Sequence, residues 1–301
     1  MLRKFLVVSL AFGLVNSINA AVESTPAHTS LSAAEIANKN VAARGGLQAW
    51  RGVQAISETG KLGAGGDKRE ALPSAAPVAA PAGKKISKVP SSPRLSEEAQ
   101  LPFTMEMQRP RKMRFELQFK GQTAVQVYDG ANGWKLRPYL NRLEVEPFTA
   151  DELAMASMQA ELDGPLVDYA AKGTRIELEG TEKVEDRDTY KLKLTMKDGH
   201  SIHLWIDAQS FLEAKVEGQP RRLDGKMHPV EIYYRDYRPV GGLQIPFLLE
   251  TKVLTVADPG QKVRELPVPP ERIAIEKVVL NPKLEASQFS KPNTDMASVR
   301  P

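Results

Sequence analysis

The sequence predicts a mainly β protein built on one large antiparallel sheet, and three observations support this fold class. Segments 112–120 (KMRFELQFK), 189–197 (TYKLKLTMK) and 201–207 (SIHLWID) alternate apolar and polar residues. Turn-forming residues separate many such segments, and only two stretches carry helical signals. Because side chains of a strand alternate between two faces, each segment has one apolar and one polar face. The apolar side of the resulting sheet must be covered by protein or by a ligand.

The strands follow from this alternation, taken along the chain. Turns are expected at 129–133 (DGANG), 197–199 (KDG), 224–226 (DGK) and 241–242 (GG), where several residues tolerate a positive φ. The predicted strands span residues 53–62, 102–108, 112–120, 122–128, 133–139, 142–148, 174–182, 189–197, 201–207, 212–217, 230–237, 243–256 and 272–280.

Two helical regions are expected, at 33–50 and 150–170. Ser32 with Glu35, and Thr149 with Glu152, have the spacing of capping boxes, in which each side chain bonds the other residue's backbone. The second helix carries Leu153, Met155, Met158 and Leu162, and Gly164-Pro165 interrupts it. These four apolar residues predict a lid over the sheet.

Residues 63–100 differ from the rest in composition. They are rich in Ala, Pro, Gly, Ser and Lys and show no apolar periodicity, which predicts a disordered insertion between the first two strands. The glycines at 60, 63, 65 and 66 superficially resemble a phosphate loop, but the Gly-Lys-Ser/Thr ending and the following helix are missing.

The first twenty residues predict a signal peptide. Arg3 and Lys4 precede an apolar stretch at 5–15, and the small residue Ala20 suits cleavage before Ala21. An uncleaved anchor is the alternative, although the apolar run is short for a bilayer span. Residues 21–301 are then one exported domain, expected in the periplasm. The chain has no cysteine, so we expect neither a disulfide nor a lipid anchor on a cysteine.

The composition argues against several classes of function. The 301 residues include 41 basic and 37 acidic side chains, and this balance predicts no field for nucleic acid. No catalytic residue, metal ligand set or cofactor motif is recognisable, so we expect a protein that is not an enzyme. His200 and His203, three residues apart on a strand, face opposite sides. A hidden hydrolytic site is the alternative, but most carboxylates alternate with Lys or Arg as on a solvated surface.

The apolar face is the strongest clue to function. Two short helices cannot cover a broad sheet, and a sheet that curls turns its concave face into a cavity. Methionine suits flexible aliphatic guests, although a filled core remains the alternative for any single side chain. The predicted cavity lining comprises Met105, Met107, Met113, Phe115, Leu117, Phe119, Val125, Val127, Trp134, Leu192, Leu194, Met196, Ile202, Leu204 and Ile206.

Several segments together resemble a known family. They are RPRKMRFELQFKGQTAVQVYDGANGWKLRPY at 109–139, LDGPLVDYAAKG at 162–173 and YRDYRPVGGLQIPFLLE at 234–250. This set is similar to the periplasmic outer-membrane lipoprotein-sorting proteins of the LolA/LolB-like superfamily. The resemblance covers nearly all of the exported chain except 63–100.

The resemblance implies an incomplete antiparallel β-barrel, a half-barrel, with helices at its mouth. It also implies a soluble carrier or chaperone that holds acyl chains of a lipoprotein or another lipid. Partner proteins of the inner and outer membranes, and a monomeric state, are part of the same expectation. The alternative is a sensory or regulatory domain on the same fold that recognises lipidated or misfolded envelope proteins.

Overall fold

The computed structural model describes residues 31–64, 99–138, 142–256 and 263–293. The predicted signal peptide lies outside the described residues, as does most of the predicted insertion. The edges of that insertion are corrected, because residues 63–64 and 99–100 belong to strands rather than to a loop. The described residues of Ser32–Pro301 form one compact unit. Across the described ranges, no helix is both long and apolar enough to cross a bilayer.

Within the described residues, thirteen strands form one antiparallel sheet in the order β6-β5-β4-β3-β2-β1-β13-β12-β11-β10-β9-β8-β7. Every pair of neighbouring strands except β1 and β13 is consecutive in sequence. The sheet therefore consists of two meanders, β1–β6 and β7–β13, which are joined at the centre by the pairing of β1 with β13. The strands are β1 (Ala55–Ala64), β2 (Ala99–Gln108), β3 (Lys112–Phe119), β4 (Gln122–Tyr128), β5 (Gly133–Arg137), β6 (Arg142–Pro147), β7 (Arg175–Val184), β8 (Arg187–Thr195), β9 (Ser201–Asp207), β10 (Glu213–Leu223), β11 (Lys226–Val240), β12 (Leu243–Val253) and β13 (Glu271–Leu280).

The strand prediction is confirmed element by element, with shifts at the ends. The largest shifts extend β10 and β11 toward their shared turn at Asp224 and Gly225. Pro220 and Pro229 lie in these extensions, where Pro cannot donate a ladder hydrogen bond and the register of the pair shifts.

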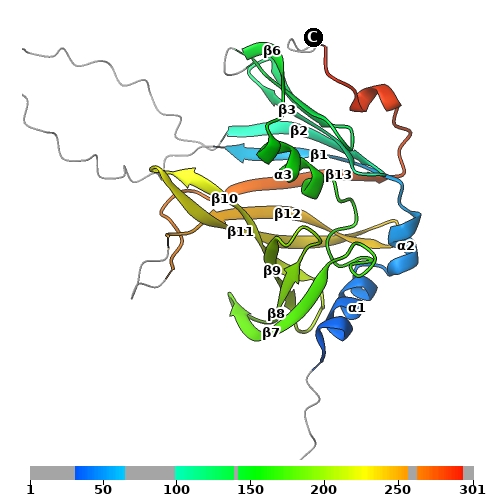
Figure 1. The fold of residues 1–301 in the computed structure, drawn as a ribbon, viewed down its shortest axis with the longest axis vertical. Coiled ribbons are helices and arrows are strands. Elements are labelled where there is room, and N and C mark those ends of the chain that lie inside the picture. The colour runs from blue at the N-terminus through cyan, green and yellow to red at the C-terminus, as the bar shows by residue number, and fades with distance from the viewer. Residues whose placement is uncertain (1–30, 65–98, 139–141, 257–262, 294–301) are drawn as a thin grey trace, which may run out of the picture. The chain divides into compact units, whose positions relative to one another are not determined.

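In the described part of the chain, the sheet is accompanied by the helical segments α1 (Ala33–Ala43), α2 (Leu47–Gly52), α3 (Ala150–Gln159) and the 3₁₀ turn η2 (Ala286–Phe289). Both predicted capping boxes are present, at Ser32 with Glu35 and at Thr149 with Glu152. The second helical region is shorter than predicted, because α3 ends at Gln159 and residues 160–173 continue as turns. Figure 1 shows the curled sheet, with α3 on the viewer's side of it.

The register defines two faces, because directly paired residues of an antiparallel ladder point to the same side. The inner face, as we call it, carries Ile56, Met107 and Met113, which are neighbours across β1, β2 and β3. Helix α3 lies on this side: Lys135 pairs with Gln126 on this face and its Nζ lies 2.6 Å from a carboxylate oxygen of Glu152 in α3.

The opposite, outer face is not uniformly polar, which corrects the expectation of one wet side. Phe289 of η2 is buried there against Val125, Val127 and Leu136. A second buried cluster contains Val184, Trp205, Ala214 and Tyr233. Apolar area is therefore buried on the face that alternation assigned to solvent. Phe289, which follows β13, covers one part of it, and side chains of the sheet itself cover the other.

Candidate functional site

The inner face divides into two arms with different burial. On the arm of β8 and β9, Leu192, Leu194 and Ile206 are fully buried and Leu204 is 1% exposed. Helix α1 packs at this arm, where Asn40 donates from Nδ2 to the carbonyl of Phe211 and the ring of Phe211 stacks on Tyr190. This arm is close-packed core. Met196 and Ile202, at its far end, are half-buried.

The arm of β2 and β3 is covered less. Met107 and Met113 are buried near the end of their strands that adjoins α2 and the loop 160–173, whereas Met105, Phe115, Leu117 and Phe119 are only half-buried. Phe115 stacks on the buried ring of Phe103 at 5.8 Å between centroids. The half-buried surface continues across the central strands through Leu62, Leu101, Val278, Ile273, Leu249 and Ile232.

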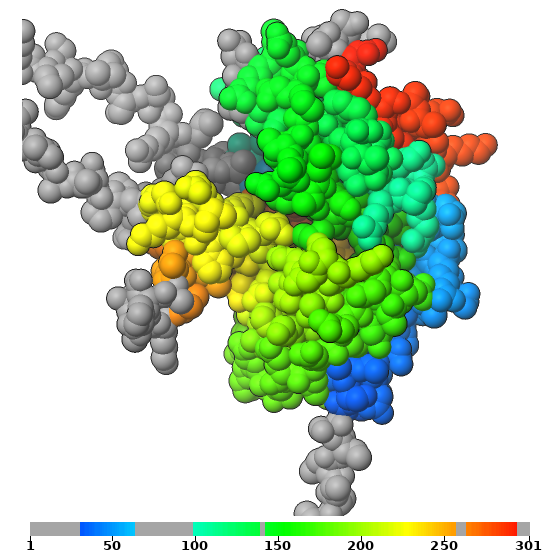
Figure 2. Space-filling view, viewed as in Figure 1, coloured from blue at the N-terminus to red at the C-terminus, as the bar shows by residue number. Residues whose placement is uncertain are grey.

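Figure 2 shows a recess on this side of the molecule, between α3 (dark green) and β10 (yellow), with atoms of more distant strands in faded orange-brown at its floor. We call ten half-buried apolar side chains of the inner face on β1–β3 and β11–β13 the acyl wall, after the ligand proposed below. They are Leu62, Leu101, Met105, Phe115, Leu117, Phe119, Ile232, Leu249, Ile273 and Val278.

Three residues of the predicted cavity lining lie on the wrong face. Val127 pairs with Arg114 and Trp134, and Val125 pairs with Glu116, so all of these side chains point outward. Val125 and Val127 are fully buried beneath Phe289, with Trp134 packed against the same cluster. A strand's alternation gives the spacing of its apolar side chains, but it does not reveal which of the two faces they share with the next strand.

The predicted lid is also corrected in part. Leu162 is buried and Leu153 half-buried, but Met155 and Met158 are 36% and 39% exposed. Helix α3 turns Ala156 rather than its methionines toward the protein. Glu152 and Glu161 tie this region to the sheet side through Lys135 and Arg111.

Charged side chains fasten the loop 160–173 next to α2 and the end of β2. Arg109 donates from Nη2 to Asp163 at 2.7 Å, Lys172 donates from Nζ to the same carboxylate at 2.8 Å, and Arg44 donates to the Asp163 carbonyl. Burial opposes ionisation of Asp163, but hydrogen bonds to its carboxylate outweigh burial and hold its pKa below the usual value. The loop is therefore pinned at one end of the inner face.

Sequence reasoning missed one polar residue of the inner face, Glu58. It lies in the middle of β1, paired with Met105 of β2 on one side and Val278 of β13 on the other. Its side chain is 7% exposed, and burial raises its pKa to about 7. The signal was present in the sequence, because Glu58 is in phase with Ile56 and Leu62 on the same strand.

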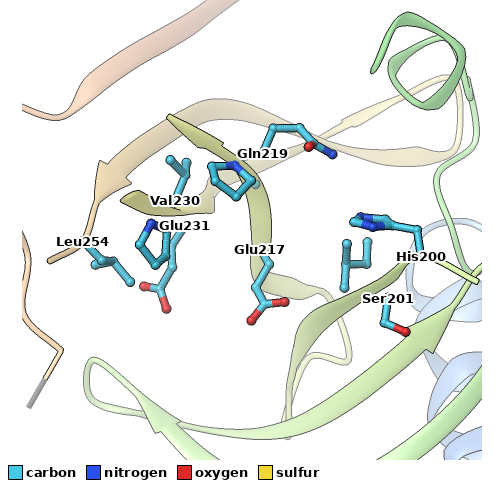
Figure 3. Close-up of a pocket in the computed structure, with 11 residues that line it drawn as sticks. His200, Ser201, Glu217, Gln219, Val230, Glu231 and Leu254 are labelled. Atoms are coloured by element: carbon cyan, nitrogen blue, oxygen red, sulfur yellow. The ribbon is translucent and has the colours of Figure 1, made fainter. Parts of the chain in front are cut away.

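A separate pocket of ≈ 270 Å³ opens where β9 and β10 diverge beyond Val216. Figure 3 shows Glu217 and Glu231 pointing the same way in it, with His200 and Ser201 across from them. Both carboxylates already have partners, since Glu231 accepts from Lys215 and Tyr233 and Glu217 accepts from the backbone N–H of His203. Among the described residues, no three His, Cys, Asp or Glu side chains are grouped as for a metal ion.

Comparison with known proteins identifies the architecture. No protein-family model and no curated protein matches the sequence. The structure is similar to a LolA superfamily protein from Nitrosomonas europaea, with 13% identity, a TM-score of 0.49, and coverage of 87% of this chain and 99% of that chain. A DUF1329 family protein from Desulfovibrio piger gives 12% identity, a TM-score of 0.49, and coverage of 87% and 98%.

A third solved structure is a domain from Vibrio parahaemolyticus described as an outer membrane lipoprotein-sorting domain. It is 12% identical, with a TM-score of 0.51, and the match covers 86% of this chain and 96% of that chain. The chain has the fold of this lipoprotein-sorting domain. The predicted fold class is thus confirmed. In this chain the sheet is antiparallel and curled, and its edge strands β6 and β7 do not pair, so the barrel is incomplete.

Proposed function

We propose that this protein is a soluble carrier of the periplasm, which holds the acyl chains of a lipoprotein or another lipid against the acyl wall. The observation that carries the proposal is the half-buried apolar surface of β2, β3 and the central strands, beside an arm of the same sheet that is fully packed. An apolar surface left partly open inside a curled sheet is typical of a site for an aliphatic ligand.

The physical driving force is sufficient for such a ligand. Burial of each methylene contributes about 0.8 kcal/mol, so roughly ten methylenes contribute about 8 kcal/mol before the costs of association. Met105 adds an unbranched, adaptable side chain, which suits guests of variable shape. Helix α3 bounds the recess on the side of β4 and β5. The pinned loop 160–173 lies at the end of the inner face next to α2 and the end of β2.

Binding of a fluorescent fatty acid tests the proposal. Leu117→Asn places an amide in the acyl wall and should weaken binding about tenfold or more, because the bound chain would then bury an unsatisfied polar group. Leu143→Asn is the matched control, since Leu143 is 53% exposed on β6 and should leave binding unchanged. Absence of binding by the wild type, or equal binding by both variants, would overturn the proposal.

A further inference from the structure

Glu58 stands out because it is a carboxyl group among apolar side chains on the inner face. Its direct neighbours across the ladder, Met105 and Val278, both belong to the acyl wall. Along its own strand, Ile56 is 2% exposed and Gly60 contributes no side chain. A Cβ at Gly60 would lie 2.1 Å from the carbonyl oxygen of Ala274, so this position of the strand cannot carry a side chain.

No hydrogen bond or ion pair joins the carboxyl group of Glu58 to any described residue, although 93% of the residue is covered. Its oxygens are not among the fully enclosed polar atoms, so the carboxyl group can still be reached from the inner face. Glu213 provides a contrast on the same face. It is 6% exposed, but it lies 3.3 Å from Arg44 and accepts a hydrogen bond from the hydroxyl of Tyr237 at 2.9 Å. A largely covered carboxyl group without a protein partner is costly, and a hydrogen bond from a bound molecule would reduce that cost.

We propose that Glu58 is the polar anchor of the ligand site: it accepts a hydrogen bond from a neutral donor, a hydroxyl or amide N–H, on the amphiphile whose chain contacts the acyl wall. This inference rests on the proposed function and names the class of ligand. Both oxygens of a carboxylate and the carbonyl oxygen of a carboxylic acid accept hydrogen bonds, so the contact forms in either protonation state.

The surroundings select a neutral donor over a charged one. An anionic head group would be repelled by the ionised form of Glu58. An ammonium group would have to lose its hydration among Met105, Val278 and Ile56, and one carboxylate offsets that loss only in part. A hydroxyl or an amide has the smaller desolvation cost and satisfies the buried carboxyl group directly.

Two ligands of equal chain length provide the test, 1-decanol and its methyl ether, which lacks the donor. Their affinities are measured by displacement of an uncharged fluorescent alkyl probe, so that the charge of Glu58 does not act on the probe itself. The wild type should bind decanol roughly 5–10-fold more tightly than the ether, as expected for one hydrogen bond. Glu58→Leu should bind both ligands equally. Glu58→Gln, which keeps an acceptor, should preserve the preference for decanol.

Glu276→Leu is the matched control, since Glu276 pairs with Lys61 at the surface of the neighbouring strand and should keep the wild-type ratio. Equal binding of decanol and ether by the wild type would overturn the role of Glu58 and leave the carrier function standing. Tighter binding of decylammonium than of decanol would overturn the neutral-donor class. If the wild type binds none of these compounds, the result overturns both the proposed carrier function and the proposed role of Glu58.

Discussion

The two arms of the inner face have the same sequence pattern and different surroundings. Segment 112–119 of β3 and segment 201–207 of β9 both alternate apolar and polar residues. Leu204 and Ile206 are nonetheless almost completely buried, while Phe115, Leu117 and Phe119 are only half-buried. The difference lies in what covers them, because α1 packs at the β7–β9 arm and no helix of the described residues seals the far part of β3. Alternation predicts which face of the sheet a side chain lies on, but it does not predict what packs over that face.

The largest expected effect is on the packed arm. Leu204→Ala should lower the free energy of unfolding by about 3 kcal/mol, within the range of about 2–5 kcal/mol for truncation in a close-packed core. Denaturant unfolding measures the loss. If the free energy of unfolding fell by less than about 1 kcal/mol, the β8–β9 arm would not be close-packed, and the distinction between the two arms would be wrong.

The second effect concerns Glu58, between the two arms on β1. Its pKa is about 7 in the folded protein against an ordinary value of 4.5, so from pH 4.5 to 7 the folded protein keeps a proton that the unfolded chain has lost. The free energy of unfolding should therefore fall as pH rises through this window, by up to about 3 kcal/mol, and level off above it. Subtracting the pH profile of Glu58→Gln isolates this contribution. A flat difference between the two profiles would mean that Glu58 is solvated.

A smaller effect is expected on the open arm. Leu117→Ala should cost only about 1 kcal/mol, because its side chain is already half in contact with water and its removal leaves no sealed cavity. The same denaturant series as for Leu204→Ala gives the comparison. Equal losses at Leu117 and Leu204 would remove the distinction between the arms.

The smallest effect is expected on α3. Met158→Gln replaces a side chain that is 39% exposed and should change the free energy of unfolding by less than about 0.5 kcal/mol. Thermal unfolding suffices to measure it. A fall in the free energy of unfolding of more than about 2 kcal/mol would show that Met158 packs against the sheet, as the predicted lid requires.

Much of the fold could be predicted because its signals are local. Alternation located the strands, and side-chain spacing located both capping boxes, at Ser32 and Thr149. The candidate site was predicted less well, because it depends on register and on cover. Val125 and Val127 alternate like Phe115 and Leu117, but the offset between β3 and β4 turns them outward. Their cover, Phe289, lies far along the chain after the last strand.

Glu58 shows the opposite failure. Glu58 is in phase with Ile56 and Leu62, but a carboxylate between Ser57 and Thr59 is typical of a surface residue. Only the pairing of β1 with both β2 and β13 shows that it is central in the sheet and therefore buried. That pairing joins strands that are far apart in sequence.

Contacts between the alkyl chain of a bound ligand and individual methyl groups test the central claim most directly. Protein labelled with ¹³C at Leu and Met methyl groups is saturated with decanol, and intermolecular nuclear Overhauser effects are recorded. The account predicts contacts from the chain to Leu117 and Met105 and none to Leu194 or Leu204. Contacts to the β8–β9 methyl groups, or none to the β2–β3 arm, would contradict it.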